Sequence, residues 1–500
     1  MTDNRFSDPG TRSIRRLADQ AFARSAGAPL TTGNDVELLF DSTQNFPAWL
    51  NAIAQASESV MVEMYLFAND DFGRQFQDAL LQRLAAGVKV FLLYDAVGSW
   101  RTHFSRFFTP LRQAGAEVRA YNPLDITRGF SLLGRNHRKL IITDRRLAFV
   151  SGLCISSRWE GDPVSGQPPW RDTGIRLSGP VVQEAVAAFV DSWNSVGPAL
   201  PLPALPLPEH GHVAARLIAT TPATAHMMRL DLMIASVARR SLWLTDAYFM
   251  GTSLYLTALK EAAKDGVDVR LLVPRSSDIG WIATVSRTLY RPLLEAGVRV
   301  FEWNGPMIHA KTAVADGRWA RIGSSNLNLS SWFANRELDV AIEDDGIAAE
   351  MEFKFLRDLD HATEIVLKGH RRRPVLSQPR DLEPPPIIRS LIHPSITARR
   401  ASAAARQALR ISDALGAVVR GSRAVENSEA SAFMSIGIVL LALALLIGYF
   451  PYLVAAPLAV LLGISGITVA LRALGLYTAR HRKHRDEEEH DAPSSGSENE

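Results

Sequence analysis

The feature that most constrains this chain is an internal repeat. A strand-like apolar run at 60–67 is followed by a helical pattern that ends at Gly87, and the second half repeats this order with a run at 242–249 and Gly266. Each half continues with a strand, a helix and another strand, the strands at 88–94 and 118–121 or at 267–273 and 298–301. Alternation of strand and helix, with glycine where each helix ends, predicts two α/β halves.

We therefore expect two α/β repeats related by a pseudo-twofold axis, with one site at their interface. The predicted order along the chain is an N-terminal segment (1–33), a first repeat (34–198), a proline-rich connector (199–212), a second repeat (213–368), a basic linker (369–430), a membrane hairpin (431–472) and a charged, disordered tail (473–500).

The hairpin is predicted because residues 431–471 contain no charged side chain. One helix of that length would be about 60 Å long, twice the hydrocarbon thickness of a bilayer, so two spans at 432–450 and 453–471 fit better. Basic residues on both flanks predict a multi-pass protein of the cell inner membrane whose catalytic part is cytoplasmic. A buried core hairpin is the alternative.

Composition adds three weaker constraints. The formal net charge of +3 is poor evidence for a polyanionic partner. The single cysteine, Cys154, excludes an internal disulfide framework and fits a reducing compartment. The first thirty residues lack the apolar core of a signal peptide, so cleaved secretion is not expected. The basic segment 13–26 suits either a membrane surface or a solvated helix.

Each half ends in the same motif, H-x-K-x4-D. The copies consist of His137, Lys139 and Asp144 in the first half, and of His309, Lys311 and Asp316 in the second. Each copy starts an apolar, strand-like run, and residues two apart on a strand face the same side. We therefore expect the histidine and lysine of each copy to point into one cavity. Two matches in register within a repeat are a far stronger signal than one match alone.

These residue types suit cleavage of a phosphodiester. A neutral imidazole can attack phosphorus, and a second imidazole can give a proton to the departing alkoxide. Two lysines can stabilise the negative charge that spreads over the non-bridging oxygens. Histidine titrates near neutral pH, which allows both roles.

Further polar residues follow each motif. Ser324 and Asn326 offer hydroxyl and amide groups for phosphate oxygens. Glu337 is the predicted partner that orients His309, and Asp172 the predicted partner that orients His137, each through a carboxylate–imidazole hydrogen bond. The aspartates of the two motifs are candidates for acid–base chemistry, although a structural turn or ion pair is the interpretation we prefer.

With these motifs the chain resembles the phospholipase D superfamily over residues 34–365, and within it the bacterial cardiolipin synthases. The runs that carry the closer resemblance are 136–142, 170–180 and 307–313. The resemblance implies a ping-pong phosphatidyl transfer through a phosphohistidine, with His137 as nucleophile and His309 as acid and later base. It also implies that neither a metal nor another cofactor takes part.

Two features depart from that family. Cys154 stands where the first repeat often has asparagine, so the two halves are expected to bind phosphate unequally. A nucleophilic role for this cysteine is a minor alternative. The predicted hairpin is C-terminal, whereas family members often carry membrane segments at the N-terminus.

The expected partners are therefore the membrane and phospholipid substrates such as phosphatidylglycerol, and the expected product is cardiolipin or a similar lipid. A hydrolytic phospholipase D is the nearest alternative, since it differs only in letting water resolve the intermediate. A nucleic-acid phosphodiesterase is less favoured because the repeats lack a concentrated basic and aromatic run. A non-catalytic scaffold is disfavoured by the intact histidines and lysines. The oligomeric state stays open.

Overall fold

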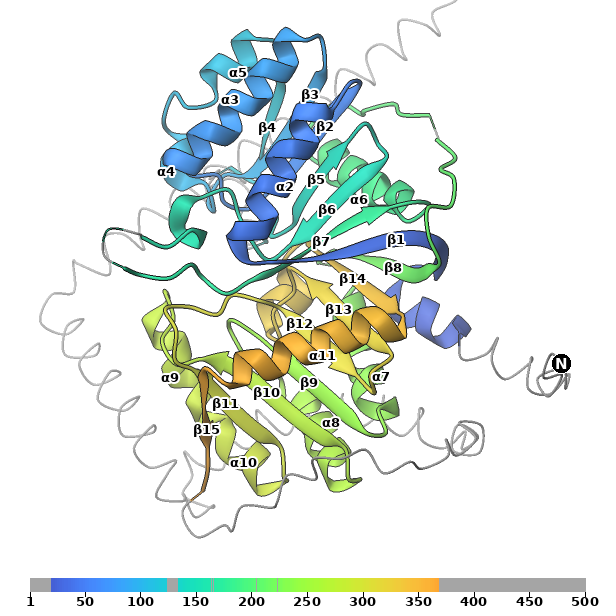
Figure 1. The fold of residues 1–500 in the computed structure, drawn as a ribbon, viewed down its shortest axis with the longest axis vertical. Coiled ribbons are helices and arrows are strands. Elements are labelled where there is room, and N and C mark those ends of the chain that lie inside the picture. Colours follow the sequence, from blue (N-terminus) through green and yellow to red (C-terminus); the bar gives the residue numbers. More distant parts are fainter. Residues whose placement is uncertain are drawn as a thin grey trace, which may run out of the picture. The chain divides into compact units, whose positions relative to one another are not determined.

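The computed structural model describes residues 19–123, 134–162, 164, 166–203, 205–222 and 224–367 (Figure 1). The first repeat contains β1 (Thr31–Phe40), α2 (Asp41–Gln55), β2 (Ser59–Met64), α3 (Asp71–Ala85), β3 (Lys89–Asp95), α4 (Trp100–His103), α5 (Thr109–Gln113), β4 (Glu117–Tyr121), β5 (Lys139–Thr143), β6 (Leu147–Ser151), the 3₁₀ turn η2 (Ser157–Trp159), β7 (Thr173–Ser178) and α6 (Val182–Asn194).

The second repeat has the same order of elements. It contains β8 (Val213–Thr220), α7 (His226–Val237), β9 (Ser241–Thr245), α8 (Ser253–Lys264), β10 (Asp268–Pro274), α9 (Gly280–Thr288), α10 (Tyr290–Glu295), β11 (Arg299–Trp303), β12 (Thr312–Ala315), β13 (Trp319–Gly323), the π-helical turn η3 (Ser330–Ala334), β14 (Glu337–Glu343), α11 (Asp345–Leu359) and β15 (Ala362–Ile365).

All strands of the described residues form one mixed sheet of fifteen strands. Its order is β15-β11-β10-β9-β12-β13-β14-β8-β1-β7-β6-β5-β2-β3-β4. Read outward from the antiparallel β8–β1 pair, the strands of the two repeats follow one another in matching order, and β15 is added at one edge. The predicted pair of α/β repeats is confirmed, and the matching order places their pseudo-twofold relation at the β8–β1 pair.

The helices cover both faces of this sheet. On one face α6 and α11 pack over a core cluster that runs through both repeats, including Phe189 and Trp193 from α6 and Phe355 from α11. On the other face each repeat has its own core, with α2, α3 and α5 in the first and α7, α8 and α10 in the second. The shared core joins the two repeats along the face that carries α6 and α11.

Glycine ends several helices, as expected. Gly87 after α3 has φ 84° and Gly266 after α8 has φ 93°. This left-handed backbone is costly for residues with a Cβ atom and reverses the chain into the next strand.

None of the helices in these described ranges is long and apolar enough to cross a membrane. The predicted hairpin at 431–471, the linker before it and the charged tail lie outside the described residues, as do residues 13–18 of the basic segment 13–26.

Candidate active site

The two histidine segments each lie beside the other repeat. Asn136 forms a parallel bridge with Arg336, and Arg171 forms one with Ile308. Through these bridges the backbone N–H of His137 donates to the carbonyl of Arg336 at 2.9 Å, and that of His309 donates to the carbonyl of Arg171 at 2.7 Å. Each histidine is therefore positioned by backbone from the opposite half of the chain.

These backbone contacts between the repeats also decide which carboxylate is hydrogen-bonded to each histidine. Nδ1 of His137 lies 2.9 Å from a carboxylate oxygen of Glu337, and Nδ1 of His309 lies 2.8 Å from one of Asp172. The predicted pairing of His137 with Asp172 and of His309 with Glu337 was wrong. Each carboxylate comes directly after a residue, Arg171 or Arg336, whose backbone bridges to the other repeat. The carboxylate therefore meets the histidine of that other repeat.

Ion pairs between the repeats hold these bridged residues in place. Arg171, just before Asp172, contacts Asp358 of α11 with Nε 2.9 Å from a carboxylate oxygen. Arg336, just before Glu337, contacts Asp191 of α6 at 2.5 Å. The two pairs occupy matching places in the repeats. Each joins the residue before the carboxylate to a helix of the other repeat, α11 for Arg171 and α6 for Arg336.

Both carboxylates are fully buried and hydrogen-bonded. Glu337 accepts from the hydroxyl of Ser324 at 2.5 Å and from the amide of Asn335 at 3.2 Å. Asp172 accepts from the indole N–H of Trp159 and from the backbone of Thr173. Burial opposes their ionisation, but the neighbouring histidines, lysines and hydrogen bonds outweigh it and lower the pKa of both carboxyl groups. They remain anions that accept Nδ1–H.

The histidines are held neutral. Burial lowers the pKa of His137 in spite of Glu337, and burial together with Lys311 lowers the pKa of His309 to about 4. Because each Nδ1–H is donated to a carboxylate, Nε2 carries the lone pair and is the atom available for reaction.

The lysines lie in the same buried site. Lys139 and Lys311 are each about 1% exposed, and each ammonium group donates to the carbonyl of the histidine two residues earlier. Burial lowers the pKa of both lysines, that of Lys311 to about 8. Their spacing predicts that these residues lie on strands, but β5 begins only at Lys139 and β12 only after Lys311. The histidines therefore lie just before the strands, next to the bridged residues Asn136 and Ile308.

Two tyrosines that the sequence analysis did not select complete the site. Tyr65 lies with its ring 4.8 Å from that of His137 and 5.2 Å from the Lys139 ammonium. Tyr248 has matching contacts at 5.7 Å from His309 and 5.4 Å from Lys311. Each tyrosine closely follows its strand, β2 or β9, and its presence in both repeated apolar runs was the available signal.

The motif aspartates are structural. Asp144 has φ 52° and accepts hydrogen bonds from the backbone N–H groups of residues 57, 58 and 59. Asp316 has φ 56° and does the same for residues 239, 240 and 241. Each lies at the far end of a strand, roughly 15 Å along the chain from its lysine. They fix the turn before β2 or β9, which supports the structural interpretation that we prefer from the sequence over acid–base chemistry.

The remaining phosphate-binding candidates separate into two roles. The Ser324 hydroxyl donates to Glu337 and accepts from the backbone of Leu338, so it orients the carboxylate. The side-chain carbonyl of Asn326 is buried with no hydrogen-bond partner among the described residues. At the matching place in the first repeat Cys154 is also buried, and burial raises the pKa of its thiol. The two halves of the site thus carry different side chains at this place, and unequal binding of phosphate stays a prediction.

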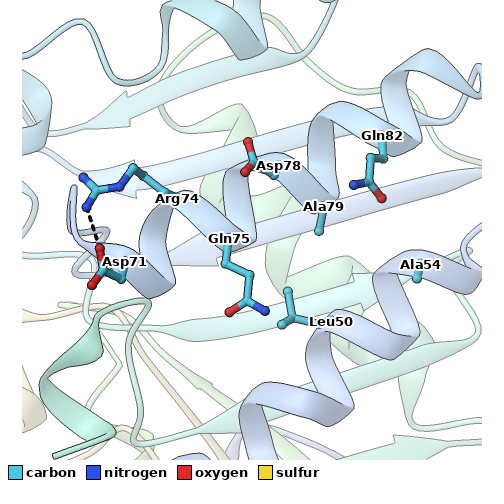
Figure 2. A pocket seen from close by; sticks show the side chains of 8 residues that line it. All are labelled: Leu50, Ala54, Asp71, Arg74, Gln75, Asp78, Ala79 and Gln82. Carbon is cyan, nitrogen blue, oxygen red and sulfur yellow. Dashed lines mark hydrogen bonds and ion pairs between the residues drawn. The ribbon is translucent and has the colours of Figure 1, made fainter. Parts of the chain in front are cut away.

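No group of three or more His, Cys, Asp or Glu side chains suited to a metal ion occurs in the part of the chain that the structure describes. A surface groove does occur between α2 and α3 (Figure 2). Polar side chains such as Gln75 and Asp78 line it, and Asp71 pairs with Arg74 at its rim. The groove contains none of the motif residues.

Comparison with known proteins agrees with this arrangement. The family described as "Cardiolipin synthase, PLD-like domain" matches residues 49–158 and 233–359. Cardiolipin synthase of Geobacillus thermodenitrificans is 32% identical over 74% of this chain and 76% of its own length. Cardiolipin synthase A of Pseudomonas fluorescens is 32% identical over 72% of this chain and 75% of its own.

A solved structure shares the fold at much lower identity. Phosphatidylserine synthase of Haemophilus influenzae superposes with a TM-score of 0.52 at 14% identity, covering 69% of this chain and 91% of that one. On the evidence of the relatives, the chain belongs to the phospholipase D superfamily and is a phosphatidyltransferase of the cardiolipin synthase-like kind.

Proposed function

We propose that the chain transfers a phosphatidyl group from one phospholipid to a hydroxyl group of another, through a covalent phosphohistidine. The observation that carries this proposal is the exchange of carboxylates between the repeats. It gives two histidines whose Nδ1 atoms are held by Glu337 and Asp172, leaving both Nε2 atoms for the reaction.

In the first step Nε2 of His137 attacks phosphorus and forms the P–N bond. The P–O bond to the leaving alcohol breaks, and His309 gives its proton to the departing oxygen. In the second step the acceptor hydroxyl loses its proton to His309 while its oxygen attacks phosphorus. The P–N bond then breaks, and His137 returns to its neutral form.

The choice of His137 as nucleophile rests on the family resemblance. His309 must carry a proton to act as the acid, whereas burial and Lys311 lower its pKa to about 4 in the free protein. A bound phosphodiester brings a negative charge into the site, which favours the imidazolium form. Lys139 and Lys311 stabilise the charge that develops on the non-bridging oxygens.

For donor and acceptor we propose phosphatidylglycerol, giving cardiolipin and glycerol, because relatives that match over most of their length are named cardiolipin synthase. Hydrolysis to phosphatidic acid is the competing outcome, since water can resolve the same intermediate. The test is to incubate the purified full-length protein with labelled phosphatidylglycerol, phosphatidylethanolamine and glycerol, and to identify all products by mass spectrometry. Cardiolipin as main product supports transfer, whereas phosphatidic acid alone assigns a hydrolase.

We further propose that the protein acts from the cytoplasmic face of the inner membrane, held there by the hairpin predicted at 431–471. The uncharged run with basic flanks supports this placement. In a Cys154→Ala background, a cysteine introduced at Ser495 should be shielded from an impermeant thiol reagent in intact cells. Labelling of that cysteine would contradict the proposed topology.

A further inference from the structure

Two short helices in matching places expose aromatic side chains to solvent. Helix α4 follows β3 and exposes Trp100 (51%), and Phe104 (66%) comes directly after this helix, while α9 follows β10 and exposes Trp281 (60%). In Figure 1 both helices lie on the left of the view, α4 in the upper repeat and α9 in the lower one. Val285, one turn beyond Trp281 on the same side of α9, is also exposed.

Helix α4 lies next to the first half of the active site. The preceding residue Gly98 packs against the ring of Tyr65, and Ser99 donates to the backbone carbonyl of Tyr65 at 3.1 Å. Tyr65 in turn contacts the ring of His137. Trp100 therefore follows directly after residues that touch the histidine's neighbour, which places it at the edge of the site.

Helix α9 has the corresponding relation to the second half. The hydroxyl of Tyr248 donates to Asp278 at 2.8 Å, and the Tyr248 ring contacts His309. Asp278 is three residues before Trp281, and Ile279 between them is exposed as well. The exposed aromatic residues thus flank the site from both repeats.

The charge around α4 is positive. The segment 100–107 contains Arg101 and Arg106 and no acidic residue. Both arginines are exposed, and neither forms an ion pair with any residue that the structure describes. Aromatic rings next to unpaired arginines suit the boundary between acyl chains and anionic headgroups.

We propose that Trp100, Phe104 and Trp281 dock the site onto a bilayer that contains anionic phospholipid. Substrate then passes from the bilayer between α4 and α9 to the histidines, while Arg101 and Arg106 bind headgroup phosphates. This inference rests on the proposed function, because it takes phospholipid as the substrate. Single exposed apolar residues are common on proteins, but here they recur at matching places beside both halves of one site.

Photo-crosslinking in the full-length protein tests this contact without using activity. Benzoylphenylalanine is placed at position 104 or 281, and the protein is reconstituted in vesicles of phosphatidylglycerol and phosphatidylcholine. Phe353 provides a matched control, since it is a phenylalanine that is 67% exposed. It lies on α11, a helix that packs against the strands of the second repeat. Lipid adducts at 104 and 281 well above those at 353 are expected. Equal yields at all three positions would overturn the proposal.

A kinetic comparison separates this inference from the proposed function. The Trp100→Ser/Phe104→Ser/Trp281→Ser variant should lose about tenfold or more of its rate on vesicles, because it loses apolar contact area. It should keep its rate on monomeric short-chain phosphatidylglycerol, and Phe353→Ser should resemble the wild type on both substrates. An unchanged rate on vesicles refutes docking while transfer stands. Adducts at 104 and 281 without any phosphatidyl transfer support docking and refute the function.

Discussion

The imidazole of His137 donates from Nδ1 to the carboxylate of Glu337 at 2.9 Å, across 200 residues of sequence. His309 and Asp172 form the reciprocal contact at 2.8 Å. Each reactive ring is thus oriented by the repeat to which it does not belong. One repeat alone would leave its histidine without the carboxylate that fixes the tautomer, so both halves are needed for either half to react.

The exchange predicts that each carboxylate variant affects one particular histidine. Glu337→Gln should lower the rate at which diethylpyrocarbonate modifies His137 and leave that of His309 unchanged. The variant removes a carboxylate that raises the pKa of the His137 ring, and a less basic neutral imidazole is a weaker nucleophile. Asp172→Asn should act on His309 alone. Peptide mass spectrometry resolves the two rings, and the opposite pattern would restore the pairing within each repeat.

Both carboxylate variants should also lower kcat by between about tenfold and about 10⁴-fold, the range found when an orienting carboxylate is removed from a histidine.

The structural reading of Asp144 and Asp316 predicts loss of stability rather than of chemistry. Asp144→Ala removes the acceptor of three backbone N–H groups and should lower the free energy of unfolding by about 1–3 kcal/mol. The kcat of the folded protein should stay within about threefold. Asp71→Ala, which breaks only an exposed ion pair, should change stability by less than about 1 kcal/mol. Denaturant titration and activity per folded molecule decide, and a large loss of kcat in a stable Asp144→Ala protein would assign it a chemical role.

The buried lysine predicts an alkaline limit on activity. Lys311 is cationic below its pKa of about 8 and becomes neutral above it. Since its charge stabilises the transition state, kcat/KM should fall as pH rises through about 8. Lys311→Arg keeps its charge at these pH values, so the fall in kcat/KM above about pH 8 should disappear in this variant, even if its maximal rate is lower. A wild-type profile that stays flat to about pH 10 would show that the charge of Lys311 is dispensable.

Removal of metal ions should leave transfer unchanged, because Lys139 and Lys311 already bring positive charge to the phosphate. Activity is measured after dialysis against EDTA, with addition of Mg²⁺ or Ca²⁺ as the comparison. Loss of turnover that a divalent ion restores would assign part of this charge to a metal.

The sequence predicted the repeated fold because its signals are local. Gly87 and Gly266 end helices at matching places, and apolar runs of strand length follow them. The motif lysines and histidines were found from identity and spacing alone. All four are buried, and their catalytic roles stay predictions.

The partners of the histidines could not be predicted because they depend on how the chain crosses between repeats. Asp172 follows the first motif in sequence, yet the Arg171–Ile308 bridge carries it to the second histidine. Tyr65 and Tyr248 were missed because an aromatic residue after an apolar strand also fits an ordinary core position. A structural turn was the preferred interpretation of the motif aspartates, but the left-handed backbone at Asp144 and Asp316 is not revealed by their spacing.

The central claim is that one histidine of this two-repeat site carries the phosphatidyl group, and direct detection of that adduct is its sharpest test. Full-length protein is mixed with phosphatidylglycerol, denatured rapidly in cold neutral denaturant and analysed by peptide mass spectrometry. We predict a phosphatidyl adduct on His137 in the wild type. His137→Ala should form no adduct and, like His309→Ala, should turn over at less than about 1% of the wild-type rate. Cardiolipin formation by His137→Ala at more than about a tenth of that rate, a loss of under roughly 1.4 kcal/mol in the barrier, would contradict the claim.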